Sequence, residues 1–207
     1  MKVDVQELNA EHYILLDKLA HDELHLFLND KLKMRKKWFF YVYMIILIVS
    51  LGSLSYTVTK NLMIGTLDFV QAILYILLGI GITMLFIPLH ELLHYIAYKI
   101  AGAKSVTFIS NIKKFYFATV AHKFVANLSE FTFIAILPFS VVLIGTLVSL
   151  PFLPLELQLT AITVLAVHNM FCSGDFTLLN YLATNKGMVT YDDTELGETY
   201  FYKTQEK

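Results

Sequence analysis

Two histidines and a glutamate stand at the end of a long apolar stretch, in the segment HELLH at residues 90–94. Residues four apart share one face of a helix, so the imidazoles of His90 and His94 can bind one metal ion. Glu91 then lies beside that ion, within reach of a water molecule. Zinc lowers the pKa of such a water towards neutrality, and a carboxylate that takes its proton makes a nucleophile for a peptide carbonyl. The spacing therefore indicates zinc-dependent peptide hydrolysis, with Zn²⁺ as cofactor; the alternative is a polar patch exposed to lipid headgroups.

A second polar cluster interrupts an apolar stretch further along, in the segment AVHNMFCSGDFTLL. His168, Cys172 and Asp175 are spaced by four and three residues, which places them on one face of a helix. A catalytic zinc site needs three protein ligands and an open position. We expect Asp175 to be the third ligand, because its charge has no lysine or arginine partner in the apolar runs; His168 is the alternative, and Cys172 is more typical of packing. Asn169 could donate a hydrogen bond to a developing oxyanion, and an interhelical hydrogen bond is an equally good alternative.

The composition predicts a membrane protein that holds these clusters between helices. The chain has 207 residues, of which 57% are apolar and 16% are charged, and the charges collect in residues 1–37, 99–130 and 183–207, with long apolar runs between them. About 20 consecutive apolar residues cross a bilayer as a helix. Four runs meet that length, at about 38–58, 68–100, 131–150 and 157–181. The predicted fold class is therefore an all-α membrane protein with four transmembrane helices.

The polar flanks of this 38–182 domain have patterns of their own. Leucines at helical spacing in 1–37 predict a cytoplasmic amphipathic helix lying on the membrane or on the bundle. The loop between the second and third spans is rich in β-branched and aromatic residues, which predicts a β-hairpin over about 105–120 with its turn at the polar break 111–114. The tail 183–207 has the same character, with two short strand-like pieces.

Lysine and arginine near the ends of apolar runs set the orientation of a membrane protein. Five basic residues precede the first run directly, and the middle loop adds Lys104, Lys113, Lys114 and Lys123. The other two loops contribute a single lysine between them. We therefore expect a multi-pass protein of the cell membrane with both termini and the middle loop in the cytoplasm. At ~1.5 Å per residue, the two polar clusters then lie at similar depth near the cytoplasmic side.

Charge and cysteine content narrow the partners. The net charge of −1, without a basic stripe interleaved with aromatic residues, gives no indication of nucleic-acid binding. One cysteine excludes an intrachain disulfide and a multi-cysteine metal site. The expected partners are the lipid bilayer and a membrane protein or peptide substrate. The sequence leaves the oligomeric state open.

Four features taken together resemble a bacterial family of small membrane proteins described as putative zincin peptidases. They are HELLH at the end of a second span, a strand-rich cytoplasmic loop, AILPF opening the third span, and the pattern HNxxxSGD in the fourth. The arrangement of two histidines on one span and an aspartate on a later one is similar to that of the site-2 protease clan of intramembrane metalloproteases. In that clan a glycine follows the aspartate, whereas here it precedes Asp175.

The resemblance implies a role for each matching residue. By this pattern His90, His94 and Asp175 correspond to the metal ligands, Glu91 to the general base, and Asn169 to a polar residue near the site. The expected function is a zinc-dependent intramembrane or membrane-associated endopeptidase that acts near the cytoplasmic side. The alternative is a non-catalytic metal-binding membrane scaffold or regulator derived from such a protease.

Overall fold

The computed structural model describes residues 8, 12–32, 37–111 and 116–205. The chain divides into two compact units, which are described in turn. The first, here called the sheet unit, contains residues 1–40, 91–137 and 174–207. The second, the helical unit, contains residues 41–90 and 138–173.

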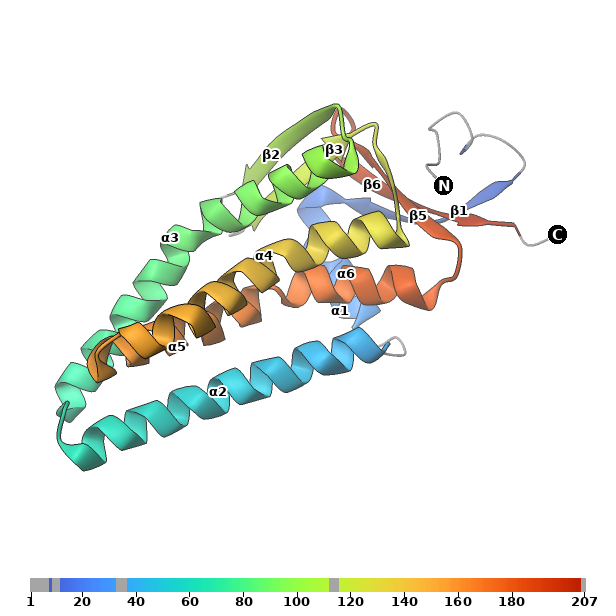
Figure 1. Ribbon diagram of the computed structural model, residues 1–207. Helices are drawn as coiled ribbons and strands as arrows, with labels where there is room; N and C mark the ends of the chain where they lie inside the picture. Colours follow the sequence, from blue (N-terminus) through green and yellow to red (C-terminus); the bar gives the residue numbers. More distant parts are fainter. Residues whose placement is uncertain (1–7, 9–11, 33–36, 112–115, 206–207) are drawn as a thin grey trace. The chain divides into compact units, whose positions relative to one another are not determined.

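A mixed six-stranded sheet forms the centre of the sheet unit (Figure 1). Its strands are β1 (Tyr13–Ala20), β2 (Ser105–Asn111), β3 (Tyr116–His122), β4 (Val125–Asn127), β5 (Met188–Asp193) and β6 (Glu198–Thr204). The order across the sheet is β1-β6-β5-β3-β2, with β4 paired to β5. Every pairing is antiparallel except that of β3 with β5. The expected all-α fold class is therefore wrong, because the chain is mostly helical but also builds a sheet.

The prediction of an N-terminal amphipathic helix from the leucine spacing is also wrong over residues 13–20, because these residues form β1. This strand pairs antiparallel with β6, from Tyr13 opposite Thr204 to Ala20 opposite Glu198. A short apolar run fits a strand and a helix equally well by periodicity, and here a distant partner strand decides between them. Only α1 (Leu24–Lys31), which follows the short 3₁₀ turn η2 (His21–Glu23), is helical in this region.

The two other strand predictions are confirmed. In the middle loop, β2 pairs with β3 as an antiparallel hairpin from Ser105 opposite His122 onward. The expected turn at 111–114 lies for the most part outside the described residues, since the description stops at Asn111 and resumes at Tyr116. In the tail, β5 pairs with β6 around Gly197, whose φ of +68° is a conformation that glycine adopts without strain.

The core of the sheet unit joins strands to helices that come from three separate parts of the sequence. Its largest cluster of buried residues is Leu19, Ala126, Phe131, Ala135, Leu179, Tyr181, Leu182, Met188 and Phe201. A polar anchor lies beside it, where the carboxylate of Asp17 on β1 accepts hydrogen bonds from Lys31 Nζ and from the hydroxyl of Tyr181. The N-terminal segment is thus fixed onto α6 (Ser173–Thr184), the helix that carries Asp175.

A buried carboxyl also ties the strands of the sheet together. Asp192 on β5 accepts hydrogen bonds from the hydroxyl of Thr199 on β6, at 2.7 Å, and from the backbone N–H of Ala121 on β3, at 3.3 Å. Burial raises the pKa of this carboxyl to about 6, against the two hydrogen bonds, which lower it. At neutral pH the carboxylate accepts both bonds and holds β3 beside the tail hairpin.

The long helices follow the predicted spans closely. They are α2 (Trp38–Ile64), α3 (Phe69–Ala101) and α4 (Leu128–Ser149), followed by a short 3₁₀ turn, η4 (Leu150–Phe152). Within the described residues, three helices are long and apolar enough to cross a membrane. The fourth predicted span is a bent pair instead, α5 (Leu155–Phe171) and α6, so the number of spans is four if the pair counts as one. The chain is therefore compatible with a multi-pass membrane protein.

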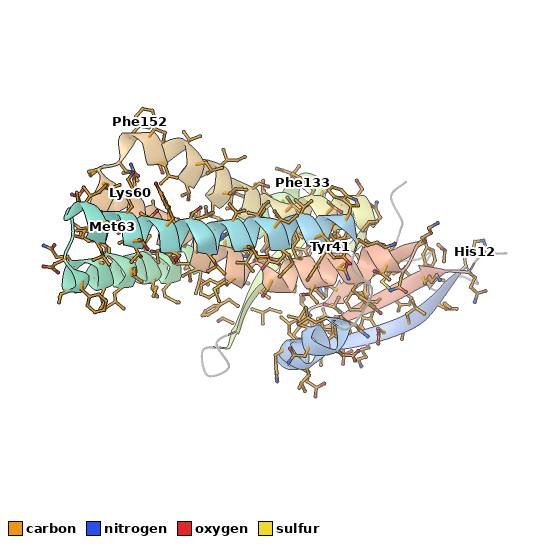
Figure 2. The ribbon with its side chains drawn as sticks, turned by 90° about the horizontal axis from the view of Figure 1, so that it is seen from below. His12, Tyr41, Lys60, Met63, Phe133 and Phe152 are labelled. Atoms are coloured by element: carbon orange, nitrogen blue, oxygen red, sulfur yellow. The ribbon has the colours of Figure 1, made fainter. Side chains whose placement is uncertain are left out.

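The helical unit places apolar side chains outward and packs small and polar ones inward. Tyr41, Met63 and Phe152 project from it and are 57%, 82% and 84% exposed (Figure 2), which suits contact with lipid tails. Inside, α3 and α5 approach so closely that a Cβ on Gly79 would lie 2.6 Å from Cβ of Thr163. Small residues allow such close approach between membrane helices. This contact fixes α5 against the first part of α3, the helix that carries His90.

Candidate metal centre

His94 is held so that only one of its two ring nitrogens is available to a metal. It lies on α3, is buried, and its Nδ1 is 2.9 Å from the backbone carbonyl oxygen of Ile134. A carbonyl can only accept, so Nδ1 carries a proton, and in the neutral ring the lone pair is then on Nε2. Metal-binding histidines almost always donate their other N–H in this way.

The other ring nitrogen of His94, Nε2, faces Asp175. It lies 3.4 Å from Oδ1 of Asp175. Two ligands that bind one tetrahedral zinc at about 2.0–2.2 Å are themselves about 3.3–3.5 Å apart. Imidazole and carboxylate are also among the donors that zinc prefers in proteins. The pair therefore fits zinc, as the sequence predicted for these two residues.

Asp175 owes its position to the break in the fourth apolar segment. The sequence predicted one helix over about 157–181, but α5 ends at Phe171 and α6 begins at Ser173. Serine and glycine are weak helix formers, and Ser173 and Gly174 follow Cys172 directly. Asp175 thereby falls in the first turn of α6, where the helix dipole favours a negative charge.

Glu91 is positioned by a residue that sequence reasoning missed. Its Oε2 lies 2.8 Å from the hydroxyl oxygen of Thr119 on β3, which also lies 2.9 Å from the backbone carbonyl oxygen of Glu91. Both oxygens of Glu91 can only accept when the carboxyl is ionised, so the Thr119 hydroxyl is the donor. The predicted β-hairpin thus contacts the HELLH segment. No local pattern marks Thr119, because its partner lies 28 residues away in the sequence.

His90 lies one helical turn before His94 on α3 and is the last residue of this helix that belongs to the helical unit. Its Nδ1 is 3.2 Å from Nε2 of His168 on α5. The other ring nitrogen of His168, Nδ1, is 3.6 Å from Sγ of Cys172. His168 and Cys172 are both almost completely buried, with 1% and 0% of their surface exposed. Of the three residues predicted to share one helix face, His168 and Cys172 therefore lie together next to His90, whereas Asp175 belongs to the separate helix α6.

The contact with His168 bears on the choice of third ligand, which stays a prediction, since His90 belongs to a possible ligand set with His168 and Cys172 and to another with His94 and Asp175. The two nitrogens of an imidazole point in different directions, and His168 lies at Nδ1 of His90. If Nδ1 of His90 donates its proton to His168, then His90 resembles His94, whose Nδ1 donates to a carbonyl oxygen. In both rings Nε2 is then the nitrogen that can bind a metal. His168 is then a partner of a ligand and lies on the wrong side of the ring to share that ion.

Asn169 on α5 forms hydrogen bonds to another helix, α2. Its Nδ2 donates to the hydroxyl oxygen of Ser50 on α2 at 2.9 Å, and its backbone carbonyl accepts from the Tyr43 hydroxyl at 2.8 Å. The side chain is fully buried, and its Oδ1 has no hydrogen-bond partner among the described residues. The interhelical alternative considered for Asn169 is thus the contact seen, whereas its role towards an oxyanion stays a prediction.

Comparison with known proteins identifies one related family. Residues 83–188, which are 106 of the 207 residues, match a family model described as "putative zincin peptidase". The matched range contains HELLH, the hairpin with Thr119, and the cluster from His168 to Asp175. No curated protein and no solved structure matches the chain.

Proposed function

Since the chain belongs to the family described as "putative zincin peptidase", we propose that it is a zinc-dependent endopeptidase that cleaves membrane-anchored substrates near the cytoplasmic face. The observation that carries this proposal is the approach of His94 to Asp175, with the ring proton of His94 held on the opposite nitrogen. The description of the family supports a metallopeptidase in general. The intramembrane position, the sidedness and the residue roles are part of the proposal.

His90, His94 and Asp175 would hold the zinc. His94 and Asp175 already face each other at the separation that two zinc ligands require. His90 lies one turn earlier on the same helix, so α3 itself presents both imidazoles on one face. Zinc, when bound, supplies Lewis acidity, which polarises a peptide carbonyl and lowers the pKa of water.

Glu91 would be the general base. It follows His90 directly, so it is turned about 100° from the face that carries the two histidines and leaves the ion's open position free. The hydroxyl of Thr119 holds one carboxylate oxygen, and the other can take a proton from water. The hydrogen bond thus fixes the orientation of the carboxylate.

Replacing Thr119 by valine should lower cleavage about tenfold at unchanged zinc content. Valine keeps the shape and the strand preference of threonine but removes the hydrogen bond, and a bond to a charged group contributes about 1.5–3 kcal/mol. Serine at this position should restore most of the activity. Cleavage rates of the two variants, measured with the zinc content of the same samples, check this role. Equal rates for valine and serine would contradict it.

The sheet supports four membrane spans. One sheet joins β1 before α2, β2 to β4 between α3 and α4, and β5 and β6 after α6. These three parts of the chain must therefore lie on the same side of the membrane. An even number of membrane crossings must then separate each of these parts from the next. The first two parts are separated by α2 and α3, which cross once each. The second and third are separated by α4 and by the bent pair of α5 and α6, so this pair must act as one crossing. The basic residues of these flanks favour the cytoplasm as that side.

Cysteine-accessibility labelling tests this topology. In a Cys172→Ser background, an impermeant reagent added outside should label cysteines placed at Thr59 and Pro154. It should not label cysteines at Ser105 and Thr204 until the membrane is permeabilised. Labelling at Ser105 in intact cells would overturn the orientation and, with it, the side on which the site opens.

Substrate would be bound in an extended form along β2. Among the described strands, β2 lies at the edge of the sheet and pairs only with β3, so one row of its backbone groups can accept an added strand. A helix must be unwound before a peptide bond within it can be attacked, and pairing with an edge strand stabilises the unwound form. Phe108 of β2 is 54% exposed and stacks on Tyr95 of α3, which offers an apolar surface to substrate side chains.

Reversible chelation tests the proposed function. The purified chain in detergent should contain about one zinc per molecule and should cleave peptides derived from membrane-protein helices. A chelator that removes the zinc should abolish cleavage, because the ligands alone supply no Lewis acid, and added zinc should restore it. Zinc binding without cleavage of any membrane-anchored peptide would favour the metal-binding scaffold instead.

A further inference from the structure

A second set of possible metal ligands lies within the helical unit and has His90 in common with the proposed catalytic set. His90, His168 and Cys172 each offer one ligand atom, and these atoms all lie within 4.8 Å of one another. We propose that these three residues form an inhibitory site for a soft cation, of the class of Cd²⁺, Cu⁺ or excess Zn²⁺, which competes with the catalytic zinc for His90. The inhibitory effect rests on the proposed function, whereas the binding site does not.

The geometry of the three side chains suits a tetrahedral ion. His90 Nδ1 and His168 Nε2 are 3.2 Å apart, and two nitrogen ligands of one such ion are about 3.3 Å apart. A thiolate sulfur and a nitrogen on one zinc are about 3.6 Å apart. Since no two of the ligand atoms are separated by more than 4.8 Å, side-chain movements of about 1 Å close the set.

The donor atoms determine which cation this site prefers. A thiolate with two imidazoles and no carboxylate favours soft and borderline metals over Mg²⁺ and Ca²⁺. The proposed catalytic set has a carboxylate in place of the thiolate, so the two sets differ in the metal that each prefers. On binding, the thiol of Cys172 releases its proton to solvent. His168 and Cys172 are almost completely buried, and a bound cation would neutralise the resulting thiolate.

Competition follows from the chemistry of one imidazole. A neutral ring has one proton and one available lone pair. The second site takes the lone pair at Nδ1, the nitrogen that faces His168, and the ring proton then moves through solvent to Nε2. Catalytic zinc needs the lone pair at Nε2. His90 therefore serves one ion at a time, and binding of either ion weakens the other by the same factor.

Cadmium titration of the purified full chain tests the site. A cadmium–thiolate bond absorbs in the ultraviolet by charge transfer, and Cys172 is the one cysteine of the chain, so the absorption reports this site alone. We expect one cadmium-dependent band per chain, absent from Cys172→Ser. The band should need at least tenfold more cadmium in His168→Ala, because loss of a ligand weakens binding. Asp175→Ala should keep the band, because Asp175 belongs to the other set.

Two further measurements separate this inference from the proposed function. The amount of zinc that remains bound after the cadmium titration should fall in the wild type and stay unchanged in Cys172→Ser. This comparison measures competition for His90 without a cleavage assay. In a cleavage assay, cadmium should inhibit the wild type at concentrations at least tenfold lower than those that inhibit Cys172→Ser. Absence of the band, an unchanged band in His168→Ala, or full zinc retention in the wild type would each overturn the inference. If the cadmium band and the zinc release are observed but the cadmium-free chain cleaves no peptide, the proposed function is overturned. The inference about the binding site is then still supported.

Discussion

Replacement of Glu91 by glutamine is expected to lower cleavage at least ~10²-fold, the effect typical of losing a general base. Glutamine keeps the size of the side chain and can still accept the hydrogen bond from Thr119, but it cannot take a proton from water. Zinc content and folding should therefore stay at the wild-type level. Initial rates on membrane-anchored peptides, with the zinc content of the same samples, measure both effects.

The control for this variant is Glu156→Gln, which makes the same chemical change in the first turn of α5. It should cleave at the wild-type rate. Near wild-type cleavage by Glu91→Gln would contradict the mechanism, because a zinc site with another base would not depend on this carboxylate. A structural zinc site would gain nothing from a carboxylate beside its ligands and would bear the cost of its partial desolvation.

Substitution of Asp175 by alanine is expected to remove most of the bound zinc, whereas His168→Ala should retain most of it. Oδ1 of Asp175 lies 3.4 Å from Nε2 of His94, so loss of this carboxylate leaves the ion with two protein ligands. His168 faces Nδ1 of His90, and its loss removes a partner of a ligand, which costs affinity but leaves the three ligands in place.

Zinc per chain, measured by atomic emission after purification without added metal, distinguishes these variants. Asp30→Ala is the matched control, because the Asp30 side chain is 66% exposed and its loss should leave the zinc content unchanged. If His168→Ala loses the metal and Asp175→Ala keeps it, the ligand assignment is wrong. The zinc would then belong to the set of His90, His168 and Cys172.

The sequence predicted well those features that depend on local periodicity or on length. The spacing of His90 and His94 places them on one face of any helix, and α3 is that helix. Apolar length predicted three long helices to within several residues at each end. The middle and tail hairpins were predicted from β-branched and aromatic runs, because their partner strands are neighbours in the sequence.

The features that were missed depend on partners far away in the sequence. Residues 13–20 form a strand only because β6 supplies hydrogen-bond partners about 180 residues later, and no local signal marks that. Thr119 reaches Glu91 through the fold of the hairpin. The break at Cys172 was missed because apolar residues continue on both sides of SGD, although its serine and glycine are a weak signal for a helix end.

The most direct test of a peptidase is the appearance of new N-termini in membrane proteins of cells that express the chain. Membranes from cells with the wild type and with Glu91→Gln would be compared by N-terminal proteomics at matched expression. We expect new N-termini near the cytoplasmic ends of transmembrane helices in the wild-type sample. The corresponding uncut proteins should accumulate in the Glu91→Gln sample. Identical N-termini in the two samples would contradict the claim that this chain hydrolyses peptide bonds.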